Sequence, residues 1–85
     1  MQPDQNQMAE WLYDAVQALL AGDQEYARNL LLQVVEADEQ SEEGWLWLSG
    51  AVDSPDDQQI ALENVLEINP ANAYARRGLE MLGRR

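Results

Sequence analysis

Residues 27–36 read ARNLLLQVVE, and this stretch decides the fold. Its apolar side chains recur at steps of three and four residues, which is the spacing of one face of an α-helix. These apolar positions are Ala27, Leu30, Leu31, Val34 and Val35, while Arg28, Gln33 and Glu36 fall on the opposite face. The stretch therefore predicts an amphipathic helix that buries one stripe against a neighbouring element.

The same periodicity recurs on both sides of this stretch and divides the chain into five short segments. Asp23, Ser41 and Asn72 are placed to cap the start of a helix, because their side-chain oxygens can accept from a free backbone N–H. Pro55 suits the first turn of a helix, and Pro70 disfavours helical geometry in the residue before it. The fold class predicted is all-α, with about five helices that pack as antiparallel neighbours because the links are short.

The segment around residues 44–52 allows two interpretations. Alternation over Trp45–Leu48 is typical of a strand, whereas the short run and its helical neighbours favour a helix. We predict a helix. Trp11 and Trp45 are expected in the core, and Ala27 is expected where the first two helices approach most closely.

An internal repeat appears when the segments are aligned. Trp11 and Trp45 lie 34 residues apart, and LLQVVEAD at residues 31–38 reappears as ENVLEINP at residues 63–70. With these residues the chain resembles the tetratricopeptide repeat (TPR) family over about residues 8–82. The matching positions are Trp11, Ala15, Gly22, Asp23, Ala27, Trp45 and the run VLEINP at residues 65–70.

The TPR resemblance implies antiparallel hairpins stacked as a short right-handed superhelix. It divides residues 8–85 into one domain, with repeat 1 at about 8–40, repeat 2 at about 41–70 and a capping helix at about 72–83. Residues 1–7 are expected to form a flexible tail. The chain departs from the family at Asp14, at Glu39 and in the SPDD turn at residues 54–57.

Charge and composition exclude several classes of function. The chain has 85 residues, 16 acidic and five basic, for a formal net charge of −11. That length gives one small domain. The acids lie mainly in residues 1–70, whereas four of the five arginines lie in residues 71–85. No nucleic-acid partner is expected, because phosphate binding requires a basic face.

The residue types that are absent argue against catalysis. The chain has no Cys, His or Lys, which removes thiol nucleophiles, imidazole bases and Schiff-base amines. The Asp53–Asp57 cluster does not fit a calcium loop, because Gln58 and Asn64 stand where such a loop needs Gly and Glu. We expect a non-enzyme with no cofactor and no bound metal.

Targeting signals also bear on the expected location. The polar start of the chain is unlike a signal peptide, and no apolar run reaches the length of a membrane span. A cytoplasmic protein without a membrane partner is expected.

The expected function is binding of another protein. In the TPR family the first helix of each repeat lines a groove, which by resemblance places Leu12, Val16, Leu46 and Gly50 on or near it. Trp47 lies about 200° around the helix from Trp45. We favour packing of Trp47 against the fourth or fifth helix, with an exposed contact residue as the alternative. The expected contact surface comprises Leu12, Val16, Leu46 and Trp47, bordered by Asp53, Asp56 and Asp57.

Such a surface would favour an apolar or basic amphipathic segment of the partner. Two alternatives stay open for the groove itself: it is free to bind a partner, or the fifth helix or the N-terminal tail folds over and fills it. Self-association into a homo-oligomer is the alternative function, because two repeats are fewer than the roughly three that a stable solenoid needs. The acidity would also fit adaptation to high salt or a genomic bias.

Overall fold

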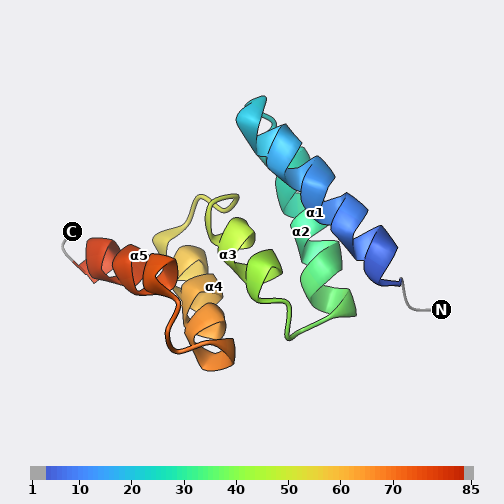
Figure 1. The fold of residues 1–85 in the computed structure, drawn as a ribbon. Coiled ribbons are helices and arrows are strands. Elements are labelled where there is room, and N and C mark those ends of the chain that lie inside the picture. Colours follow the sequence, from blue (N-terminus) through green and yellow to red (C-terminus); the bar gives the residue numbers. More distant parts are fainter. Residues whose placement is uncertain (1–3, 84–85) are drawn as a thin grey trace.

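Five α-helices joined by short links make up the described chain. The structure is a computed structural model that describes residues 4–83 (Figure 1). The helices are α1 (Gln5–Leu20), α2 (Gln24–Ala37), α3 (Glu42–Ser49), α4 (Pro55–Ile68) and α5 (Ala73–Gly83). The all-α prediction with about five helices is confirmed.

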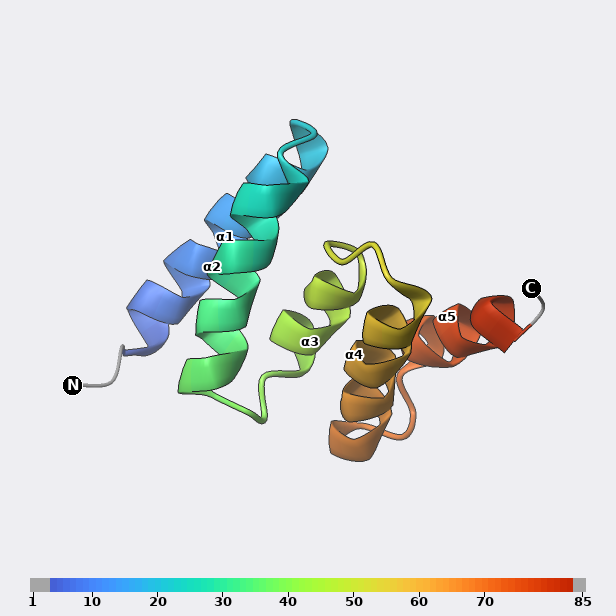
Figure 2. The ribbon, with the colours of Figure 1, turned by 180° about the vertical axis from the view of Figure 1, so that it is seen from behind.

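The helices pack in the order in which they follow one another along the chain. α1 lies antiparallel to α2, α3 lies antiparallel to α4, and α5 closes the series against α4 (Figure 2). α2 joins the two hairpins by packing on α3, while α1 touches α3 only lightly. The result is an elongated body of 40 × 27 × 17 Å, in which stability comes from contacts between neighbours.

Side-chain caps start most of the helices, as the sequence predicts. The side chains of Asp23 and Ser41 accept from the backbone N–H groups of Tyr26 and Gly44, at 3.2 and 3.1 Å. Asn72 caps α5 in the same way, accepting from the N–H of Ala75 at 2.9 Å. Each cap satisfies a backbone donor that has no partner inside the helix.

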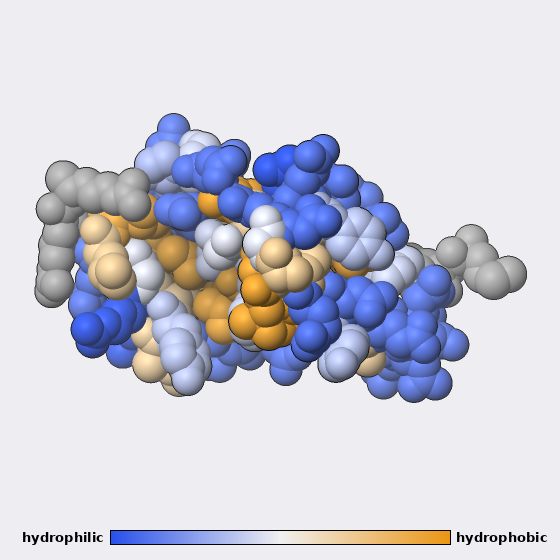
Figure 3. Space-filling view, turned by 90° about the horizontal axis from the view of Figure 1, so that it is seen from above, coloured by the Kyte–Doolittle hydropathy of each residue, from blue (hydrophilic) through white to orange (hydrophobic). Residues whose placement is uncertain are grey.

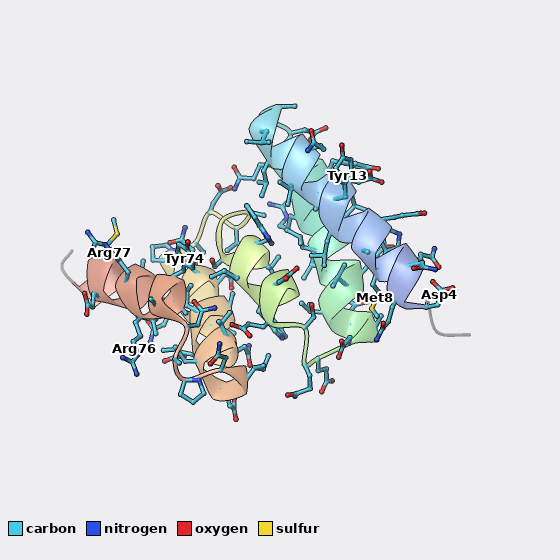
Figure 4. All side chains as sticks on the ribbon, in the orientation of Figure 1. Asp4, Met8, Tyr13, Tyr74, Arg76 and Arg77 are labelled. Carbon is cyan, nitrogen blue, oxygen red and sulfur yellow. The ribbon has the colours of Figure 1, made fainter. Side chains whose placement is uncertain are left out.

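The start of α1 differs from the prediction. The helix begins at Gln5, inside the segment predicted as a tail, because Asp4 accepts from the N–H of Gln7 at 2.8 Å and so acts as its N-cap. Figure 4 shows Asp4 at this end of α1. Residues 1–3 of the predicted tail lie outside the described residues.

Two glycines allow the turns and close contacts that the stack requires. Gly22 lies in the α1–α2 link with a φ of +84°, a left-handed conformation that costs other residues energy. Gly44 is buried at the start of α3. A Cβ at Gly44 would lie 3.0 Å from methyl groups of both Val34 and Val35, so α3 can approach α2 because this residue has no side chain.

The interior consists of two apolar clusters rather than one. The first lies among α1, α2 and α3, where Ala27 and Leu31 are completely buried. The second lies between α4 and α5 around Leu62, Val65 and Ala75. Trp45 packs against both clusters and therefore joins them, and Trp11 packs against the first. Both tryptophans thus contribute to the core, as predicted.

α5 covers the end of the second cluster, as the sequence predicts for a capping helix. Leu79 and Leu82 are partly buried against this cluster, whereas Arg76, Arg77 and Glu80 are exposed. Within the part of the chain that the structure describes, none of the helices combines the length and apolarity that a bilayer crossing requires.

A polar contact between distant residues holds α5 and the α4–α5 link to the start of α3. The Glu42 carboxylate oxygen Oε2 accepts from Asn72 Nδ2 at 2.6 Å and from Asn69 Nδ2 at 2.8 Å. The hydrogen bond from Asn72 and then that from Asn69 lower the pKa of Glu42 below its ordinary value, while burial acts weakly in the opposite direction. The ionised form of Glu42 is therefore the one that fits the folded state.

This contact predicts a dependence of stability on pH. Because the pKa of Glu42 is lower in the folded state than in the unfolded state, its ionised carboxylate stabilises the fold. This stabilisation is fully present above the unfolded-state pKa of about 4.3, and it is lost as the pH falls through the folded-state pKa. At pH 7 the urea concentration at the midpoint of unfolding should therefore be higher for the wild type than for Glu42→Gln. This difference in midpoint should become smaller below about pH 4.5. Glu43→Gln is the control, because it removes an exposed acid of the same turn. A difference between wild type and Glu42→Gln that does not change with pH would contradict the assignment.

Candidate functional site

A groove opens between α3 and α5 on the exposed side of the second core cluster. Its larger hollow has a volume of about 510 Å³ and is lined by Leu46, Trp47, Ser49, Gly50 and Tyr74. A second hollow of about 300 Å³ shares Leu46, Ser49 and Tyr74 and extends along α5 to Gly78, Met81 and Leu82. We refer to these two hollows together as the α3–α5 groove.

Large apolar side chains stay exposed around this groove. Trp47 is 40 % exposed, Tyr74 78 % and Met81 60 %. Figure 4 shows Tyr74 at the start of α5, with Arg77 on the same upper side of this helix and Arg76 below it. Exposed apolar side chains that gather at one hollow are typical of an interaction surface.

Small residues shape the α3–α5 groove: one lets α5 approach α4, and another leaves space in the larger hollow. A Cβ at Gly78 would lie 2.8 Å from Leu62 Cδ1, so the absence of a side chain there allows α5 to approach α4. Gly50 places no side chain in the larger hollow. Ser49 Oγ donates to the backbone carbonyl of Leu46 at 2.6 Å, which satisfies its hydroxyl within α3. The α3–α5 groove therefore offers apolar burial more than polar chemistry.

Figure 3 shows hydrophobic residues gathered in the middle of one face and toward the C-terminal side, with hydrophilic residues around them. The opposite end of this face, on the side of the N-terminus, is mainly hydrophilic. On this face the apolar surface is therefore concentrated at one place, which favours contact with an apolar partner there.

Trp47 does not pack as we favoured from the sequence. Its side chain lines the α3–α5 groove and keeps 40 % of its surface exposed, whereas Trp45 is the residue that packs between the two core clusters. The reason is the 200° rotation between positions 45 and 47, which turns Trp47 away from the core. The exposed alternative therefore describes this residue.

The α1 residues of the expected contact surface do not line the α3–α5 groove. Leu12 packs against the first core cluster, together with Leu19, and Val16 is partly buried. Leu46 combines both roles, since it packs against the second cluster and lines the groove. The apolar side chains expected to form a contact surface on α1 are thus partly buried in or beside the core.

The three aspartates lie elsewhere as well. Asp53, Asp56 and Asp57 are exposed, and none of them lines the α3–α5 groove. Asp53 accepts from Gln24 Nε2 at 2.8 Å, which ties the α3–α4 link to the start of α2. Asp57 lines a different hollow, between α2 and α4. The expected acidic border therefore does not line the α3–α5 groove.

Tyr74 and Met81 are groove residues that the sequence reasoning missed. Both lie in α5, which was interpreted only as a cap. Their spacing of seven residues, two helical turns, places them on one face, and this periodicity was the available signal.

The described residues hold no arrangement for metal binding. Within residues 4–83, no three or more Asp and Glu side chains are grouped so that they could hold an ion.

In comparisons with known proteins, no family model and no curated protein matches this chain.

Proposed function

We propose that this chain is a non-catalytic protein-interaction module of the TPR type, whose α3–α5 groove binds an apolar amphipathic segment of a partner protein. The observation that carries the proposal is the exposure of Trp47, Tyr74 and Met81 along the two adjoining hollows of this groove, which both have Tyr74 in their lining. A helix with an apolar stripe fits such a groove through residues at positions i, i+3, i+4 and i+7.

The energetics support binding at this groove. Burial of a large apolar side chain contributes about 1.5–3 kcal/mol relative to exposure. Three such residues on rigid helices give a partner a substantial gain, from which the cost of association must be subtracted. The antiparallel stacking of α1 with α2 and α3 with α4 agrees with the TPR arrangement and keeps α3 and α5 adjacent to the same hollow.

The test uses an uncharged probe, because the groove offers apolar burial. The probe is a helical peptide of about 14 residues, a common helix length, with a leucine stripe, glutamine elsewhere and an uncharged BODIPY dye as its label. We expect the double variant Tyr74→Ser with Met81→Ser to weaken its binding about tenfold or more, since two exposed anchors are lost. Fluorescence anisotropy measures the dissociation constant.

The matched control is Tyr13→Ser with Leu20→Ser on α1, where both residues are also highly exposed. Figure 4 shows Tyr13 extending away from the body. This pair should bind the probe like wild type, and circular dichroism should show full helicity for both pairs. Equal losses in the two pairs would contradict the proposed groove. An oligomer that only the Tyr74→Ser, Met81→Ser variant converts to a monomer would assign the groove to a second copy and replace the proposal.

A further inference from the structure

A second groove lies between α2 and α4, separate from the α3–α5 groove. It consists of two hollows, one of about 560 Å³ and one of about 290 Å³, which share Leu32 and Trp45 as lining residues. We refer to them together as the α2–α4 groove. Because both hollows have these two residues in their lining, they lie side by side, and one bound segment can span both.

The smaller hollow is apolar along most of its lining. Leu32 and Ile60 are both exposed there, on α2 and α4, and Leu48 and Val52 complete the wall. Leu32 and Ile60 stand outside both core clusters, so their apolar surface is not used by the fold. A bulky aliphatic or aromatic side chain of a ligand fits this hollow by apolar burial.

The larger hollow is acidic. Glu36 and Glu39 line it from α2 and the link that follows, and Glu67 lines it from α4. Arg28, the one basic residue of the groove, lines the smaller hollow with Asp57. Like charges around one hollow repel each other, and a bound cation removes this repulsion.

Trp45 adds a second attraction for a cation in the larger hollow. Its indole Nε1 donates to the backbone carbonyl of Glu39 at 2.9 Å, which fixes the ring where the two hollows join. A guanidinium or ammonium group over an indole face gains cation–π attraction. The larger hollow therefore combines carboxylates with an oriented aromatic ring.

We propose that the α2–α4 groove binds a basic amphipathic helix of a partner protein, which places Arg or Lys in the larger hollow and a bulky apolar side chain in the smaller one. The net charge of −11 decides between this partner and a second copy of the chain. Two copies repel each other over a Debye length of about 8 Å at physiological salt, whereas a basic segment is attracted over the same range.

The probe is a fluorescein-labelled helical peptide of about 14 residues, with a leucine stripe flanked by arginines. The rim variant carries Glu36→Gln, Glu39→Gln and Glu67→Gln. We expect it to weaken binding of this peptide about tenfold or more at physiological salt and to reduce the salt dependence of the association rate. Anisotropy gives the affinity, and stopped-flow fluorescence gives the rate.

The matched control variant carries Glu10→Gln, Glu25→Gln and Glu80→Gln, which are exposed acids outside the groove. It changes the net charge equally and should weaken binding less than about twofold. Leu32→Ala should also weaken binding. All these variants are compared in the Tyr74→Ser, Met81→Ser background, where the α3–α5 groove has lost its anchors for a leucine stripe, so failure here is distinguishable from failure of the proposed function.

Three outcomes would overturn the proposal. Equal weakening by the rim and control variants would mean that only net charge attracts the peptide. Unchanged binding in Leu32→Ala would remove the apolar anchor. A rim variant that changes the oligomeric state in light scattering, while peptide binding stays the same, would assign the groove to a second copy.

Discussion

Leu31→Ala should lower the free energy of unfolding by about 3 kcal/mol, a typical cost for removing a completely buried leucine. Leu31 has no exposed surface and lies in the first core cluster, between the two helices of the first hairpin and α3. The loss combines the transfer free energy of the removed atoms with the cavity that they leave. A domain of this size has a total stability of roughly 5–10 kcal/mol, so the variant should unfold at a much lower urea concentration.

The control is the same substitution at the next residue. Leu32 is 39 % exposed and lies outside both core clusters, so Leu32→Ala should cost less than about 1 kcal/mol. Two adjacent leucines of one helix therefore differ because only one of them faces the core. Similar losses at both positions would contradict the described orientation of α2.

Deletion of residues 73–85 should abolish cooperative unfolding and cause aggregation. The deletion removes Leu79 and Leu82 and uncovers Leu62 and Val65, which are buried in the second cluster. Terminal helices of a stacked repeat protein keep such a surface from water. Light scattering gives the association state of the truncated protein, and thermal unfolding followed by circular dichroism gives its cooperativity.

Two variants of the full chain separate loss of the apolar cover from loss of charge. Leu79→Ser with Leu82→Ser should reproduce part of the defect, whereas Arg76→Ser with Arg77→Ser should leave folding intact because both arginines are exposed. A truncated protein that remains monomeric and unfolds cooperatively would show that α5 is dispensable for the fold.

The helices were predictable because their signals are local. The stripe at residues 27–35 and the capping residues Asp23, Ser41 and Asn72 all act within one or two turns of the chain. The start of α1 was not predictable from periodicity, because Gln5, Asn6 and Gln7 are all polar. Only the N-cap residue Asp4 marks them as helical.

The candidate site was less predictable because it depends on contacts between distant residues. The sequence placed Leu46 and Trp47 on a binding surface, and both line the α3–α5 groove. It could not place Asp53, whose partner Gln24 is 29 positions away, or show that Asp57 faces α2. Periodicity identifies a helix face, whereas the neighbour of that face is determined by packing.

The central claim, that the α3–α5 groove binds an apolar segment, is tested most directly by NMR. The uncharged leucine–glutamine peptide is titrated into ¹⁵N-labelled protein, and the amide and indole shifts are followed. We expect the changes to concentrate in residues 46–50 and 74–82, including the Trp47 indole, with α1 unaffected. Changes confined to α1, or spread evenly over all five helices, would contradict the claim.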